Sequence, residues 1–184
     1  MNILVIGRKN SGKSALAEEL AMNTGDSIRY YLATMEVFDD EGSMRVERHR
    51  KARAGKGFIT VEKGYDIWDL EGEVMDIGSA TVLLECVSNL VGNEMHENPA
   101  RVKLCQVGNP DIDTFVESVY GDIVALANQT HNLVMVTSEY DKDAPGYDNS
   151  TRLFVKLLDG VNEKLMDFAD KVYDLRDEDT EVEN

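Results

Sequence analysis

The sequence predicts an α/β fold in which a mainly parallel central sheet carries helices on both faces. Short, continuously apolar runs of strand length recur along the 184 residues, and segments with apolar residues at helical spacing lie between several of them. Strands that are apolar throughout are typical of parallel sheets whose two faces are both covered. Hydrophobic residues make up 42% of the chain, enough for one substantial core.

The elements can be assigned in order from these patterns. Six strands are expected, at residues 3–6, 28–33, 58–61, 81–86, 133–137 and 172–175. A first helix is expected over residues 15–21, where alanine and leucine dominate. Apolar stripes that repeat every three or four residues predict two further helices. One stripe comprises Ile112, Phe115, Val116, Val119, Ile123 and Leu126, and the other comprises Leu153, Phe154, Leu157, Leu158, Val161, Leu165 and Phe168.

The remaining segments are expected to be irregular. Residues 92–111 and 140–150 collect Gly, Pro, Asn and Asp, so we interpret them as loops within a single domain that spans residues 1–175. Residues 176–184 carry five acids and almost nothing apolar, and burial cannot compensate for the entropy lost on ordering them. We expect them to form a solvated acidic tail.

Composition and charge exclude several classes of function. The net charge of −16 argues against general binding to nucleic acid or to anionic membranes, because these partners select clustered positive charge. No apolar run approaches membrane-spanning length, and the sequence begins with a strand rather than with a signal peptide. Two cysteines, without paired spacing, indicate no disulfide framework. A cytoplasmic protein without membrane insertion is expected.

A phosphate-binding loop motif follows the first strand. Residues 7–14 fit the pattern G-x4-G-K-[ST]; they are Gly7, Arg8, Lys9, Asn10, Ser11, Gly12, Lys13 and Ser14. In such a loop, backbone N–H groups surround phosphates, the lysine reaches the terminal phosphates and takes part in catalysis, and the hydroxyl binds Mg²⁺. The flanking strand and helix give the motif its required context. The sequence therefore predicts a P-loop NTPase-like fold that binds a nucleoside triphosphate.

A second group is needed to hold the magnesium ion, commonly a carboxylate at the end of a neighbouring apolar strand. Glu85 ends the run Thr81-Val-Leu-Leu. We predict that Glu85 and Ser14 bind Mg²⁺, with Glu85 acting directly or through water. The alternative is that Glu85 is an acid at a strand end that faces solvent.

A cationic segment surrounds His49. Between Arg45 and Lys56 there are six cations and one acid, so this segment carries +5 in a strongly acidic chain. If the segment is helical, Arg45 and Arg53 flank His49 on one face. Guanidinium groups there would lower the imidazole pKa and bind phosphate oxygens. A neutral histidine beside a phosphate is a potential nucleophile, whereas a solvated basic helix that docks a partner explains the same composition.

Read in order, these segments resemble the bifunctional adenosylcobinamide kinase/adenosylcobinamide-phosphate guanylyltransferase family of cobalamin biosynthesis. The resemblance rests on the phosphate loop and on runs of sequence spread over nearly the whole chain. These runs are Tyr31-Leu-Ala-Thr34, Phe38-Asp-Asp-Glu41, Arg45-Val-Glu-Arg-His-Arg50, Thr60-Val-Glu62, Val82-Leu-Leu-Glu-Cys86, Val134-Met-Val-Thr-Ser-Glu139, Arg152-Leu-Phe154, Val161-Asn162 and Ala169-Asp-Lys-Val172.

The resemblance implies an activity and a site. It implies phosphorylation of the aminopropanol hydroxyl of adenosylcobinamide with GTP or ATP as co-substrate, followed by transfer of GMP from GTP to give adenosylcobinamide-GDP. His49 would carry GMP as a covalent phosphoramidate. The resemblance also implies a homotrimer and nucleotide contacts beyond the phosphate loop, at Ala33, Thr34, Met35, Arg50, Lys51, Ala52, Arg53, Glu62 and Glu85.

Two segments depart from the family pattern. Residues 54–58 lack the family's proline and tryptophan, and residues 140–147 replace a glycine-rich stretch. These departures leave two alternatives open. One is a P-loop small-molecule kinase without the guanylyl-transfer step, and the other is a nucleotide-binding regulator without enzymatic activity.

Overall fold

The computed structural model describes residues 1–35, 55–70, 72, 74–106 and 108–176. Six strands in this part of the chain form one sheet in which every neighbouring pair is parallel. The order across the sheet is β3-β2-β4-β5-β1-β6. The strands are β1 (Asn2–Gly7), β2 (Arg29–Ala33), β3 (Ile59–Glu62), β4 (Thr81–Glu85), β5 (Asn132–Ser138) and β6 (Lys171–Leu175). All six expected strands are confirmed, and so is the parallel sheet.

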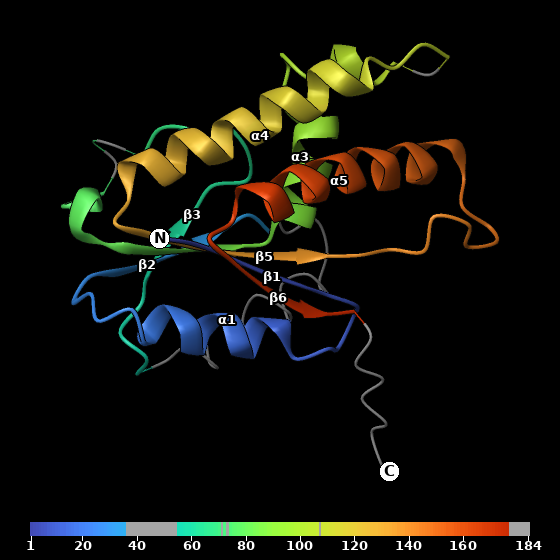
Figure 1. The fold of residues 1–184 in the computed structure, drawn as a ribbon. Helices are drawn as coiled ribbons and strands as arrows, with labels where there is room; N and C mark the ends of the chain where they lie inside the picture. Colours follow the sequence, from blue (N-terminus) through green and yellow to red (C-terminus); the bar gives the residue numbers. More distant parts are fainter. Residues whose placement is uncertain (36–54, 71, 73, 107, 177–184) are drawn as a thin grey trace, which may run out of the picture.

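Helices cover both faces of the sheet, as the sequence predicts (Figure 1). The described residues contain four α-helices: α1 (Lys13–Met22), α3 (Val87–His96), α4 (Ile112–Gln129) and α5 (Asn149–Phe168). Helix α1 lies alone on one face among these helices, and α3, α4 and α5 pack on the other (Figure 1). Because successive strand residues point to opposite faces, each strand contributes to two apolar layers.

The two layers separate cleanly along the strands. Leu4, Leu32 and Leu84 belong to the large cluster under α3, α4 and α5. Val5, Tyr31 and Leu83, their chain neighbours, belong to the smaller cluster under α1. The central strands are buried on both sides, which explains their continuous apolar sequence, whereas the edge strands β3 and β6 are largely exposed.

One expectation about loops is wrong. Residues 92–96, expected to be irregular, form the second half of α3, and residues Val102–Cys105 form a short 3₁₀ helix. The apolar stripe of α3 consists of Val87, Leu90, Val91 and Met95, all buried. Gly92 and two asparagines within the helix obscured this stripe, because these residue types favour turns in isolation. Tertiary burial of the stripe against α5 and β5 overrides that preference.

The loop expected at residues 140–150 ends earlier, because α5 begins at Asn149. Asp148 caps this helix by accepting a 2.7 Å hydrogen bond from the Thr151 N–H. Arg176, the first residue of the expected tail, donates to Glu139 and to Asp174 and is therefore attached to the folded body. Residues 177–184 lie outside the described part. No helix in the described part is long and apolar enough to cross a membrane.

Candidate active site

The loop of residues 7–14 connects β1 to α1 at the carboxyl edge of the sheet, where parallel α/β proteins bind ligands. Asn10 and Gly12 adopt the left-handed conformation, with φ of 65° and 80°, which folds the loop back on itself. A Cβ at Gly7 would lie 2.4 Å from Ser11 Oγ, so a side chain at this position would require the serine or the loop to move. The predicted strand–loop–helix context of the motif is confirmed.

The loop presents unsatisfied polar groups to its interior. The hydroxyl of Ser11 is buried, and among the described residues it has no hydrogen-bond partner. Gly12 precedes α1 without a side-chain cap, and the first turn of the helix contains no acidic residue. The N-terminal amides of a helix carry partial positive charge and attract anions. This arrangement suits a phosphate group.

Lys13 folds back across the loop, where its Nζ donates a 2.9 Å hydrogen bond to the carbonyl of Arg8. Burial lowers the pKa of Lys13, while the nearby Glu85 carboxylate acts in the opposite direction. The charged ammonium is therefore incompletely solvated. Phosphate oxygens would supply the counter-charge that this partly desolvated lysine lacks.

Ser14 and Glu85 meet at the start of α1. The Ser14 hydroxyl donates a 2.5 Å hydrogen bond to Glu85 Oε1. The second carboxylate oxygen, Oε2, accepts a 3.0 Å hydrogen bond from the hydroxyl of Tyr31. A serine hydroxyl and a carboxylate, both partly buried, are the oxygen ligands that Mg²⁺ prefers, so this donor set fits the predicted ion. Tyr31 was not among the predicted site residues.

Strand register brings three more predicted residues to the same edge. Ala33 in β2 pairs with Glu62 in β3 on one side and with Glu85 in β4 on the other. Adjacent strands are about 4.8 Å apart, so the backbones of the two glutamates are separated by about 10 Å. Met35, two residues after Ala33, is half-buried. The two carboxylates thus flank the end of β2.

Thr34, which the resemblance makes a nucleotide contact, is fully buried. Its hydroxyl accepts a hydrogen bond from the Cys86 N–H and donates one to the Cys86 carbonyl, each 2.8 Å long. The Thr34 N–H also donates to the Glu85 carbonyl. In this structure Thr34 therefore supports the end of β4 and the backbone of Glu85.

The predicted nucleophile His49 and the predicted contacts Arg50, Lys51, Ala52 and Arg53 lie outside the described residues. Lys56 forms an ion pair with Glu18 of α1, and the ring of Phe58 meets the ring of Tyr31 edge-on at a centroid distance of 6.3 Å. Residues 56–58 therefore pack on the α1 face of the sheet, beside the phosphate loop's helix.

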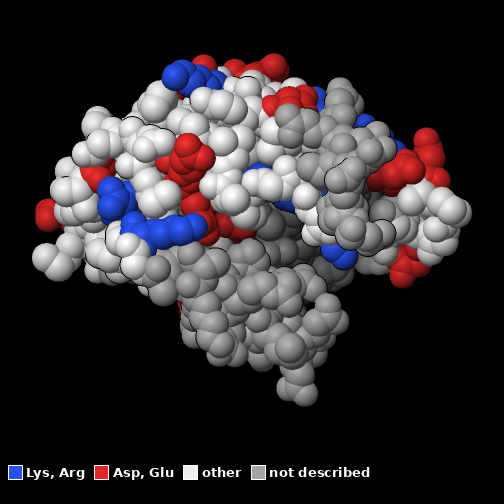
Figure 2. Space-filling view, turned by 90° about the horizontal axis from the view of Figure 1, so that it is seen from below, with Lys and Arg blue, Asp and Glu red and all other residues white. Residues whose placement is uncertain are grey.

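The charged surface on the α1 side is mixed. In the described part of this face, acidic and basic side chains are interspersed and form no continuous basic field (Figure 2). Double-stranded and single-stranded nucleic acids are bound through clustered cations.

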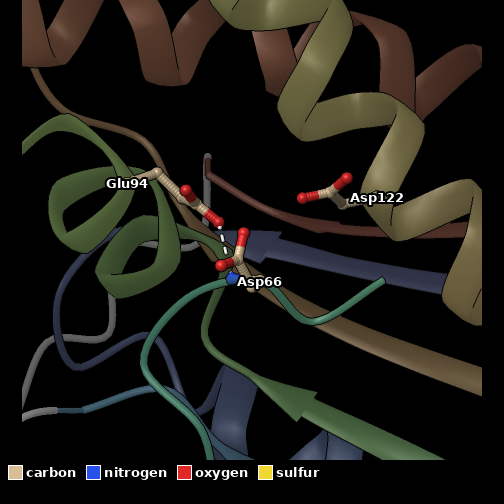
Figure 3. Close-up of side chains that lie close together, drawn as sticks. All are labelled: Asp66, Glu94 and Asp122. Atoms are coloured by element: carbon tan, nitrogen blue, oxygen red, sulfur yellow. Dashed lines mark hydrogen bonds between the residues drawn. The ribbon is translucent and has the colours of Figure 1, made fainter. Parts of the chain in front are cut away.

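A second carboxylate cluster lies away from the loop and was not predicted. Asp66, Glu94 and Asp122 come from the segment after β3, from α3 and from α4, and their carboxylates converge within 4.8 Å (Figure 3). The Arg101 guanidinium lies 2.6 Å from Glu94 and 2.7 Å from Asp122. Asn98 donates to Asp66 and Glu94. Because a guanidinium already provides the counter-charge, we interpret the cluster as a structural ion network.

The parallel sheet, the phosphate loop and the adjoining serine–glutamate pair define a P-loop NTPase-like protein of the α/β class. The family model described as "Cobinamide kinase / cobinamide phosphate guanyltransferase" (CobU) matches residues 3–176, and the chain belongs to this family.

Two relatives agree with this assignment. The chain is 30% identical over 178 residues to the "Bifunctional adenosylcobalamin biosynthesis protein CobU" of Escherichia coli (strain K12), and the match covers 94% of each chain. It is 29% identical, with the same coverage, to the protein of that name from Salmonella typhimurium (strain LT2). The protein is therefore a member of an enzyme family, and the family resemblance noted from the sequence is confirmed.

Proposed function

We propose that this protein phosphorylates adenosylcobinamide on its aminopropanol hydroxyl and then transfers GMP from GTP to the product, giving adenosylcobinamide-GDP. The family membership supports both reactions. The observation that carries the proposal is the convergence of Lys13, Ser14 and Glu85 around one end of the phosphate loop.

In the kinase step, the loop amides and Lys13 hold the phosphates of GTP or ATP. The alcohol oxygen forms a bond to the γ-phosphorus while the bond from that phosphorus to the β-phosphate oxygen breaks, and the alcohol proton is released. Lys13, whose charge is poorly solvated, donates to the phosphoryl oxygens as negative charge develops on them. Ser14 and Glu85 are the residues that would hold Mg²⁺, which neutralises phosphate charge when bound.

In the transfer step, we propose His49 as the nucleophile. A neutral imidazole nitrogen forms a bond to the α-phosphorus of GTP, and pyrophosphate leaves. A phosphate oxygen of adenosylcobinamide phosphate then displaces the histidine, which regenerates the enzyme. The arginines near His49 in sequence would screen the two anions from each other. We further propose guanine-nucleotide contacts at Glu62, Met35 and residues 50–53.

Intact-mass spectrometry tests the transfer step. Wild-type protein incubated with GTP and Mg²⁺ should gain the mass of one GMP, and His49→Ala should gain nothing. His131→Ala is a suitable control, since His131 is exposed and binds Asp26 at the opposite, amino end of the strands. An adduct that persists in His49→Ala would refute the nucleophile.

A kinase without the transfer step is the second candidate, because residues 54–58 leave the family pattern just after the cationic segment. Product mass spectrometry distinguishes the two, since the second candidate yields phosphorylated cobinamide and no GDP-linked product. Turnover of either kind would exclude a regulator without activity.

We also propose that the enzyme acts in the cytoplasm as a homotrimer. Light scattering that gives the mass of a monomer would refute the trimer.

A further inference from the structure

Tyr31 connects the interior of β2 to the carboxylate at the end of β4. Its side chain is only 4% exposed, and its hydroxyl donates to Glu85 Oε2 while Glu85 Oε1 accepts from Ser14. We propose that Tyr31 is a positioning residue that fixes the Glu85 carboxylate for a divalent cation. This inference rests on the proposed role of Glu85 in binding Mg²⁺.

The sheet geometry explains why Tyr31 can do this. Tyr31 pairs with Leu83, and Ala33 pairs with Glu85, so Tyr31 and Glu85 are diagonal neighbours two residues out of register. Both lie on the α1 face, because Tyr31 and Leu83 share the apolar cluster under α1. Diagonal neighbours are about 7–8 Å apart, a span that a tyrosine bridges with its full length.

The chemistry of a phenol suits this task. A neutral O–H donor orients a carboxylate through a charge-assisted hydrogen bond without neutralising it. An arginine or lysine in the same place would offset the negative charge that attracts the cation. With Oε2 held by Tyr31, Oε1 is turned toward Ser14, the other predicted ligand. Outer hydrogen-bond partners of this kind typically change metal affinity by about 10–100-fold.

The ring of Tyr31 is itself held in place. Phe58 contacts it edge-on with an interplanar angle of 80°. Phe58 belongs to the segment that departs from the family pattern, and the contact gives that segment a direct physical connection to Glu85 through one side chain. The orientation of the carboxylate thus depends on packing from β2 and from residue 58 together.

A purely structural role for the hydroxyl would produce the same hydrogen bond, so the test needs a matched control. Tyr30 provides it. Tyr30 is the preceding residue of β2, is also 4% exposed, and points to the opposite face, where its hydroxyl donates a 2.8 Å hydrogen bond to the Met75 carbonyl. Tyr30→Phe and Tyr31→Phe each remove one buried hydroxyl from the same strand, and only the second acts on Glu85.

The experiment measures binding of Mn²⁺, a paramagnetic substitute for Mg²⁺, to each variant in the presence of GTP, using the electron paramagnetic resonance signal of free Mn²⁺. Tyr31→Phe should weaken Mn²⁺ binding about 10-fold. Tyr30→Phe should leave it within about 2-fold of wild type, while thermal melting shows a comparable loss of stability for both variants. Equal Mn²⁺ affinity in wild type and Tyr31→Phe would overturn the inference.

Glu85→Gln separates this inference from the proposed function. If Glu85→Gln weakens Mn²⁺ binding and Tyr31→Phe does not, the role of Tyr31 alone is refuted. If Glu85→Gln has no effect, the magnesium assignment fails and the role of Tyr31 fails with it. In the double variant, Tyr31→Phe should weaken binding no further than Glu85→Gln alone, because the tyrosine acts through that carboxylate. Additive losses would overturn the inference.

Discussion

Ser14 and Glu85 are 71 positions apart in the sequence, yet their side chains form a 2.5 Å hydrogen bond. The contact joins the first turn of α1 to the end of β4, with Lys13 on the same side. The three groups that we propose to bind the triphosphate and its metal ion therefore lie close together in the fold. Such preorganisation reduces the reorganisation required when charge develops on the transferred group.

Glu85→Gln should reduce the rate of cobinamide phosphorylation strongly, because the amide keeps the shape of the side chain and removes its charge. We expect kcat to fall about 100-fold, in the range found when one group that stabilises transition-state charge is removed. Steady-state assays at saturating nucleotide measure the change. Glu19→Gln, an exposed position on α1, is the control and should retain full activity. Equal activity in both variants would contradict the role of Glu85.

Gly7→Ala should impair nucleotide binding, since its new Cβ would lie 2.4 Å from Ser11 Oγ and force the loop to shift. We expect the Kd for GTP to rise about 10-fold, equal to about 1.4 kcal/mol. Isothermal titration measures it. Gly121→Ala, at a helical glycine with open space around it, is the control and should bind GTP as wild type does. An unchanged Kd in Gly7→Ala would show that the close contact does not disturb the loop.

Arg101→Met should destabilise the protein by about 3–5 kcal/mol, because it leaves the buried Glu94 and the partly buried Asp122 without their counter-charge. Urea unfolding followed by circular dichroism measures the difference. Lys164→Met removes a cation from the exposed pair with Glu117 and should cost less than about 1 kcal/mol. Similar losses for the two variants would mean that the ion pairs of Arg101 with the carboxylates of Figure 3 contribute no more than a surface ion pair.

Asp26 should make stability depend on pH in the acid range. Burial raises its pKa, but hydrogen bonds from Thr81, Asn132 and His131 outweigh burial and hold the pKa below its ordinary value of 3.8. Because the folded pKa is depressed, the carboxylate stabilises the fold above the unfolded pKa, and this contribution is lost as pH falls through the folded value.

Asp26→Asn should therefore be less stable than wild type at pH 7, by about 1 kcal/mol. The difference should shrink as pH falls below 4. Urea midpoints measured between pH 3 and pH 7 test this. A difference that stays constant over the whole range would indicate that the ionisation of Asp26 is not involved.

Sequence reasoning succeeded where one segment determines its own structure. The strands were predictable because central parallel strands are apolar on both faces. The phosphate-binding loop was predictable because its motif is recognised together with the strand before it and the helix after it. Glu85 was predicted as a partner of Ser14 from its position at a strand end, and the structure brings the two together. Helix α3 was missed because Gly92 and neighbouring asparagines mask a stripe that only tertiary burial makes helical.

Side-chain contacts that depend on strand register or on helix packing could not be predicted from the sequence. Tyr31 reaches Glu85 only because β2 and β4 pair with a particular offset, which no local pattern specifies. The same is true of Arg101, whose partners come from α3 and α4. Thr34 was predicted as a nucleotide contact by resemblance, and its burial against Cys86 became visible only with β4 placed beside β2.

The alternation of faces along β4 determines where this chain can change length. Adding or deleting one residue between Thr81 and Glu85 would turn the carboxylate toward α3 and bury a charge in the larger apolar layer. Length changes in the segment before β3 carry no such penalty, and residues 54–58 in that segment already depart from the family pattern. We expect related enzymes to vary in length at that point and to keep β4 free of insertions and deletions.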